Sequence, residues 1–150
     1  MSFIEQLRRW FGVLRRDEHA DARGVDTGAW GEELAERHLK GKGYTVLGRR
    51  VRIRRDELDL VTRAPGGEVV FVEVKTRSSE AFGRPFSSID KRKRRALSRA
   101  AWGYLKRMRP KPSYFRFDVV EVVGNPERRD PVIRHIENGF SLMGRKRWPW

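Results

Sequence analysis

The sequence predicts an α/β fold in which a mixed β-sheet is flanked by helices. Helical periodicity lies on both sides of three consecutive short apolar runs, and a turn folds the second and third runs into a hairpin. No glycine-rich phosphate loop follows any predicted strand, which argues against a doubly wound nucleotide-binding fold. With 150 residues, the chain is long enough for one domain with a sizeable core and too short for two ordinary ones.

Residues 1–26 are predicted to form a basic amphipathic helix and a linker. Apolar residues recur at helical spacing with arginines between them: Phe3, Leu7, Trp10, Phe11 and Leu14. The polar stretch 17–26 follows as the linker. We expect the helix to dock on its own domain, and the alternative is contact with an acidic membrane surface or a partner protein.

Residues 27–142 are predicted to form the α/β domain, which begins with a helix over about 27–40. Gly41 or Gly43 ends this helix. The next strand begins at Tyr44 and continues into the arginine-rich stretch 49–55. The runs 58–63 and 68–76 are strands that pair as an antiparallel hairpin, because Ala64-Pro65-Gly66-Gly67 forms a turn between them.

A long helix is predicted next, with Ser87 or Ser88 as its N-cap and an end near Arg109, before two prolines. Residues 114–123 form a further strand and 132–136 an edge strand. The tail 143–150 is basic and aromatic.

The charge balance favours polyanionic partners. The chain has 34 Lys and Arg against 20 Asp and Glu, a net charge of +14, and such a field attracts DNA, RNA or an anionic membrane surface. The absence of cysteine excludes disulfides, thiolate zinc sites and thiol nucleophiles. The start lacks a signal-peptide pattern and no apolar run is long enough to span a bilayer, so we expect a cytoplasmic protein without stable membrane insertion.

Three charged residues in the predicted hairpin are candidates for catalysis. Asp59 lies in one strand, and Glu73 and Lys75 lie two residues apart in the other, on the face that continues from Val69 and Phe71. Charges that continue an apolar face are costly unless they are paired, hydrated or bound to a metal.

Carboxylates on adjacent strands can bind Mg²⁺ or Mn²⁺ while substrate phosphate oxygens and waters fill the remaining positions. Lys75 would orient an attacking water or neutralise the negative charge of the transition state. These residues predict a site for phosphodiester hydrolysis. The alternative is a solvated strand end, where Glu73 and Lys75 simply face water.

An ordered set of motifs resembles a known family. They are Gly31-Glu32-x-x-Ala35, Gly43-Tyr44, Glu57-Leu58-Asp59-Leu60-Val61, Phe71 to Arg77, Phe82-Gly83 and Arg116-Phe117-Asp118. Together they resemble the YraN-like family of small, functionally uncharacterised bacterial proteins, which is similar to the restriction-endonuclease-like superfamily and to archaeal-type Holliday-junction resolvases. The resemblance covers about residues 28–123.

The resemblance implies a restriction-endonuclease-like core and a metal-dependent endonuclease acting on structured or branched DNA. It implies Asp59 and Glu73 as metal ligands, Lys75 as their catalytic partner, and Glu32 as a further acid contributed by a helix. The family usually has glycine immediately before the first acidic motif, whereas this chain has Asp56. The extra carboxylate leaves open which acids bind the metal.

Basic residues on both sides of these motifs are expected to contact the phosphate backbone: Arg52, Arg54, Arg77, Arg84, Lys93 and Arg94. Lys93 lies one turn before Leu97, so its stem can pack while its ammonium reaches the site. The alternative function is a non-catalytic nucleic-acid-binding protein with a nuclease-like fold. Cleavage of two strands would require two sites, so the resolvase analogy also implies a homodimer.

Overall fold

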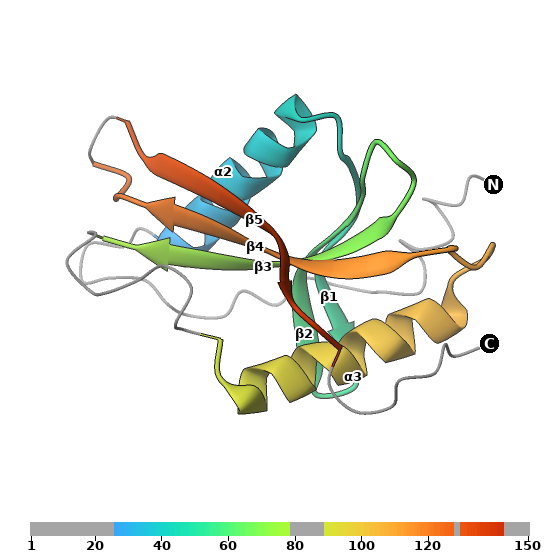
Figure 1. Cartoon of the computed structure of the whole chain (residues 1–150). Coiled ribbons are helices and arrows are strands. Elements are labelled where there is room, and N and C mark those ends of the chain that lie inside the picture. Colours follow the sequence, from blue (N-terminus) through green and yellow to red (C-terminus); the bar gives the residue numbers. More distant parts are fainter. Residues whose placement is uncertain (1–25, 79–88, 128–129, 143–150) are drawn as a thin grey trace.

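A five-stranded sheet lies between two helices in the computed structural model, which describes residues 26–78, 89–127 and 130–142 (Figure 1). The elements in chain order are α2 (Thr27–Gly41), β1 (Thr45–Ile53), β2 (Asp56–Arg63), β3 (Val69–Arg77), α3 (Lys91–Arg107), β4 (Phe115–Val123) and β5 (Val132–Phe140). The predicted N-terminal helix and the tail 143–150 lie outside the described residues.

The sheet is mixed, and its strands lie in sequence order from β1 to β5. β3 and β4 are parallel, whereas the other three neighbouring pairs are antiparallel. A parallel pair needs a crossover connection, and α3 lies in the segment that links β3 to β4. The predicted α/β class, a mixed sheet flanked by helices, is confirmed, as is the antiparallel hairpin of β2 and β3.

Each face of the sheet has its own apolar core. On one face, α3 contributes Leu97 and Tyr104, which pack with Val69 and Phe71 of β3. On the other face, α2 contributes Ala35 and Leu39, which pack with Val70 and Val72. Successive residues of β3 therefore point to α3 and α2 in turn, as strand geometry requires.

The two helices begin at aspartate caps. Asp26 accepts a hydrogen bond from the backbone N–H of Ala29, and Asp90 accepts one from the N–H of Lys93 at 2.7 Å. The prediction of Ser87 or Ser88 as the cap of α3 was therefore wrong: the helix starts at Lys91, because Asp90 has a carboxylate at the position that can reach the third amide of the helix. β5 also continues four residues beyond the predicted edge strand, to Phe140.

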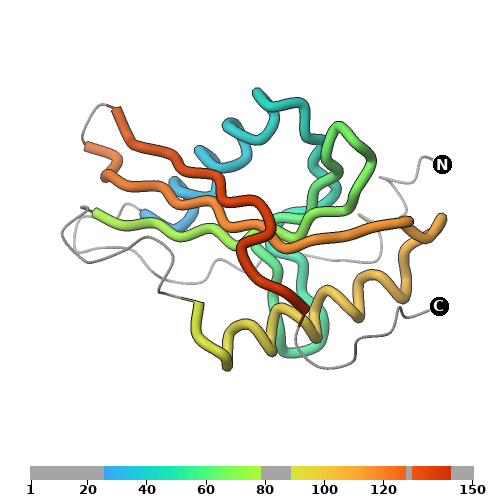
Figure 2. Tube along the Cα trace, in the orientation of Figure 1, coloured from blue at the N-terminus to red at the C-terminus, as the bar shows by residue number. Residues whose placement is uncertain are grey.

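The β1–β2 hairpin bends away from the rest of the sheet toward α3, as the chain trace in Figure 2 shows. Its tip contacts the helix where α3 carries Gly103: a β-carbon at that position would lie 2.5 Å from Cγ2 of Ile53. The absence of a side chain at Gly103 allows this approach. Among the described residues, no helix is long and apolar enough to cross a membrane.

Candidate active site at the β2–β3 junction

Asp59 and Glu73 meet where the ladder between β2 and β3 ends. Leu60 pairs with Val72, and the next position along both strands brings Asp59 opposite Glu73 on the face that α3 covers. Beyond this last pair, the backbone N–H of Val74 donates a 2.8 Å hydrogen bond to Oδ2 of Asp59. The Asp59 side chain thus occupies the place of a backbone partner and is fixed against β3.

Glu73 is a buried carboxylate with two lysine partners. Its side chain is 2% exposed, and its Oε1 lies 3.0 Å from Nζ of Lys75 and 3.1 Å from Nζ of Lys93. Its other oxygen, Oε2, is buried and has no hydrogen-bond partner among the described residues. Because buried carboxylate oxygens normally accept a hydrogen bond or bind a cation, this oxygen is a candidate binding position that the described part of the chain leaves unfilled.

The surroundings of Asp59 disfavour its charge. Burial raises the pKa of the Asp59 carboxyl to about 8, and the Glu73 carboxylate acts in the same direction. The Val74 amide and the Lys93 ammonium oppose this rise. Burial lowers the pKa of Lys93, but the carboxylates of Glu73 and Asp59 outweigh it, so the net shift is upward. The two acids together favour a proton or a cation between them.

Glu32 lies near this pair but is held by a different residue. Nε of Arg50 donates a 2.8 Å hydrogen bond to Oε2 of Glu32. Burial raises the pKa of Glu32, and Arg50 opposes the rise. Its charge also raises the pKa of Asp59. Within residues 26–78, 89–127 and 130–142, no three Asp, Glu or His side chains group closely enough to hold a metal ion, so the structure brings Asp59 and Glu73 together without Glu32 as a third ligand.

Close packing of α2 on β3 positions Glu32. The neighbouring Gly31 lies so close to the sheet that a β-carbon there would come within 1.9 Å of Oγ1 of Thr76. Only glycine permits this approach, which places the first turns of α2 beside the carboxyl end of β3. Arg50, the partner of Glu32, adopts a φ of 44°, a left-handed conformation that is unusual for arginine.

The residues predicted to contact phosphate are in different situations. Lys93 reaches the site from α3, as predicted.

Three of the predicted arginines have partners within the protein. Arg52 pairs with Glu57, Arg77 pairs with Glu121, and Arg94 donates a hydrogen bond to the carbonyl of Ile89. Arg54 is exposed in the β1–β2 turn. Arg84 lies outside the described residues. Arg52, Arg77 and Arg94 therefore have contacts within the protein that nucleic acid would have to share or replace.

Comparison with known proteins places these residues within one family. Residues 31–122 match the model of the uncharacterised protein family UPF0102. The chain belongs to the UPF0102 family. Over 118 residues it is 42% identical to a UPF0102 protein of Pelobacter propionicus, covering 78% of this chain and 84% of the relative. A UPF0102 protein of Pelotomaculum thermopropionicum is 43% identical over 121 residues, which cover 81% of this chain and 99% of the relative.

The UPF0102 match includes Asp56, the acid that replaces the expected glycine. In the structure, Arg99 of α3 binds Asp56 through two hydrogen bonds, from Nε at 3.0 Å and from Nη2 at 2.8 Å. The ionic partner of Asp56 is thus an arginine of α3. The extra negative charge is neutralised locally.

A second polar network in the UPF0102 match was not predicted. Asp118 is fully buried and binds Arg116, His135 and the backbone N–H of Asn138. Burial raises the pKa of Asp118, but these hydrogen bonds outweigh it and the net shift is downward. The sequence contained the signal, a charged pair two residues apart in an apolar strand, but gave no indication that β5 would supply the partners.

Proposed function

We propose that this UPF0102 protein is a metal-dependent endonuclease that hydrolyses phosphodiester bonds in structured or branched DNA. The observation that carries the proposal is the pair Asp59 and Glu73, held side by side and accompanied by Lys75 and Lys93. Two neighbouring carboxylates that repel each other, next to amines, are typical of sites that bind a cation and a phosphate. The net charge of +14 supports a polyanionic substrate.

The residues present fit a divalent cation bound by two carboxylates. The buried Oε2 of Glu73 lacks a partner within the described chain, and Asp59 keeps one side chain oxygen, Oδ1, outside its bond with Val74. Mg²⁺ needs no more than one or two protein carboxylates when waters and phosphate oxygens complete its shell. When bound, Mg²⁺ or Mn²⁺ would lower the pKa of a water and stabilise negative charge on the phosphate.

The chain's own groups have distinct roles in this proposal. Val74 fixes the direction of the Asp59 carboxylate, and the buried strand β3 fixes Glu73. The side chain of Lys75 is 28% exposed, so its ammonium can move from Glu73 to an incoming phosphate oxygen or an attacking water. Lys93 approaches from α3 and neutralises Glu73. Glu32 acts at longer range, by keeping the local field negative.

One observation favours a second candidate function, non-catalytic binding of nucleic acid. Both lysines lie against the same oxygen of Glu73, so the buried carboxylate already has cationic partners without a metal. A site that is neutralised in this way can be a structural ion-pair cluster inside a nucleic-acid-binding fold. This alternative predicts salt-sensitive binding without cleavage.

The deciding experiment measures metal binding and cleavage separately. Wild-type protein and Glu73→Ala are titrated with MgCl₂ and MnCl₂ by calorimetry, and both are incubated with a four-way junction, a forked duplex and a linear duplex. We expect the substitution to abolish metal binding and cleavage but leave DNA affinity in EDTA within about twofold.

Glu33→Ala is the matched control, because Glu33 is an exposed acid on α2 that pairs with Arg37. It should behave as wild type in every assay. Cleavage by Glu73→Ala at the wild-type rate would refute the assignment of Glu73. DNA binding by wild type without metal uptake or cleavage would instead establish the non-catalytic function.

A further inference from the structure

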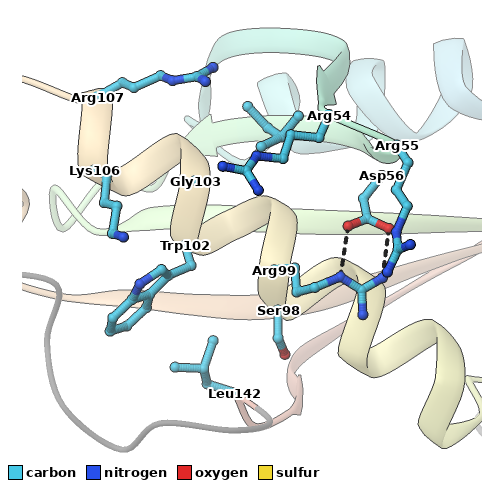
Figure 3. A pocket seen from close by; sticks show the side chains of 11 residues that line it. Arg54, Arg55, Asp56, Ser98, Arg99, Trp102, Gly103, Lys106, Arg107 and Leu142 are labelled. Carbon is cyan, nitrogen blue, oxygen red and sulfur yellow. Dashed lines mark hydrogen bonds and ion pairs between the residues drawn. The ribbon is translucent and has the colours of Figure 1, made fainter.

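A hollow of about 1110 Å³ lies where the β1–β2 turn meets α3, and no residue of the candidate active site lines it. Figure 3 shows its lining side chains, which come from the β1–β2 turn, from the second half of α3 and from Leu142 after β5. The hollow shares no residue with Asp59, Glu73, Lys75 or Lys93. It therefore requires an explanation separate from the proposed cleavage site.

The lining of this hollow is strongly cationic. Five of its eleven residues carry a positive charge: Arg54, Arg55, Arg99, Lys106 and Arg107. Asp56 supplies the one negative charge of the lining, and Arg99 neutralises it (Figure 3). Within the described part of the chain, no acid forms an ion pair with the other four cations. A concave surface with four uncompensated cations attracts an anion with several charges.

Trp102 gives the hollow an aromatic surface as well. Trp102 is half-buried, and it lies between Arg99 and Lys106 on the same side of α3. An indole that is partly open to solvent among arginines and lysines offers a face on which a nucleobase can stack. Nucleic-acid sites that accept any sequence combine these two features, a cationic path for phosphates and an aromatic side chain for bases.

The backbone of the turn supports a functional role. Arg54 has a φ of 57°, in the left-handed region where glycine or asparagine is usual. An arginine there costs stability, and strain of this kind concentrates at functional sites. Gly103 brings the helix against Ile53 and so sets the distance between the turn and α3. Both features place cations at the edge of the same hollow.

We propose that this hollow binds a single-stranded segment of nucleic acid, with phosphates against the cations of the turn and of α3 and a base stacked on Trp102. The inference deepens the proposed function, because it rests on nucleic acid as the partner and specifies an unpaired strand. The C-terminal residues 143–150 follow Leu142 directly, but they contain three basic and no acidic residues, so charge disfavours them as the occupant.

The test measures binding in EDTA, so that cleavage plays no part. Fluorescence anisotropy is recorded with a labelled 12-nucleotide oligo(dT) and with a duplex of equal length. We expect Trp102→Ala to weaken oligo(dT) binding roughly tenfold and Trp102→Phe to restore most of the affinity, since stacking needs an aromatic ring. Duplex binding should change less than twofold in both variants.

A charge-matched pair of double variants separates the hollow from general attraction. Lys106→Glu with Arg107→Glu reverses two charges at the end of α3, and Arg37→Glu with Lys40→Glu reverses two on α2, on the opposite side of the sheet. Both pairs change the net charge by the same amount, and each includes a residue of the last helical turn. We expect a loss of more than tenfold for the first pair and of less than threefold for the second.

Equal losses for the two pairs, or wild-type affinity of Trp102→Ala for oligo(dT), would overturn the proposal. Circular dichroism establishes that each variant folds. Glu73→Ala separates the two proposals: it removes cleavage and leaves oligo(dT) binding intact. Oligo(dT) binding that depends on Trp102, in a wild type that cuts nothing, supports the hollow and refutes only the nuclease.

Discussion

Nζ of Lys93 lies 3.1 Å from Oε1 of Glu73, which links the first turn of α3 to the end of the buried part of β3. Lys75 approaches the same oxygen from within β3. Glu73 is therefore neutralised at Oε1, whereas its buried Oε2 has no hydrogen-bond partner among the described residues. In the proposed nuclease, this asymmetry would leave Oε2 for a cation while Oε1 stays anchored by the two lysines.

Replacing the two partners should move the pKa of Asp59 in opposite directions. Glu73→Gln removes a negative neighbour, so the pKa of Asp59 should fall below about 8. Lys93→Met removes a positive neighbour, so the pKa should rise. Titration of the Asp59 carboxyl carbon by NMR measures both. A shift in the same direction for the two variants would contradict the arrangement of charges.

Asp59→Asn should stabilise the protein, and more so at pH 8 than at pH 4. The folded-state pKa of about 8 lies far above the unfolded value of 3.8, so between these values the folded state binds an extra proton and stability falls as pH rises. Above pH 8 the loss is complete. We expect a gain on the order of 2 kcal/mol at pH 8, less than the full shift implies because the side chain keeps some contact with solvent. Thermal unfolding across this pH range is the measurement, with Glu33→Gln, a change at an exposed acid on α2, as the control.

Gly31→Ala should destabilise the fold by about 1–3 kcal/mol, because the added methyl would collide with Oγ1 of Thr76. The cost should be smaller when Thr76 is alanine, so a double-mutant cycle in urea measures the contact directly. Gly41→Ala is the control. It lies at the end of the same helix in open space, and alanine there should stabilise by up to about 1 kcal/mol.

Arg54→Gly should raise stability while it weakens nucleic-acid binding. Glycine adopts the φ of 57° without strain, so a gain of up to about 1 kcal/mol is expected. The same change removes a cation from the hollow beside α3 and should lower oligo(dT) affinity several-fold. Chemical denaturation and anisotropy on one sample measure the two effects. A loss of both stability and affinity would mean that Arg54 acts mainly as a structural residue.

Alternation within the strands made much of the site predictable from the sequence. Val69, Phe71 and Glu73 share a face because side-chain direction repeats every two residues, and the turn at 64–67 fixed the pairing that brings Asp59 opposite Glu73. The position of Lys93 was predictable for a similar reason. It lies four residues before Leu97, which faces the core, so it extends the same side of α3 toward β3.

Contacts between distant elements were not predictable. No local pattern indicates that Arg50 will turn to a left-handed conformation and bind Glu32, or that Asp56 will pair with Arg99, forty-three residues away. The hollow beside α3 was not predictable from the sequence for the same reason. Trp102 and its neighbouring cations resemble an ordinary solvated helix face until the bent β1–β2 hairpin is placed next to them.

A single rigid helix carries Lys93 near its start and Trp102 nine residues later, a separation of roughly 14 Å along its axis. If a nucleic-acid strand binds at the indole of Trp102 and is cleaved beside the carboxylates, the length of α3 sets the distance between the bound base and the cleaved bond. The scissile bond would then be chosen by its distance from an unpaired base, with no need to recognise sequence.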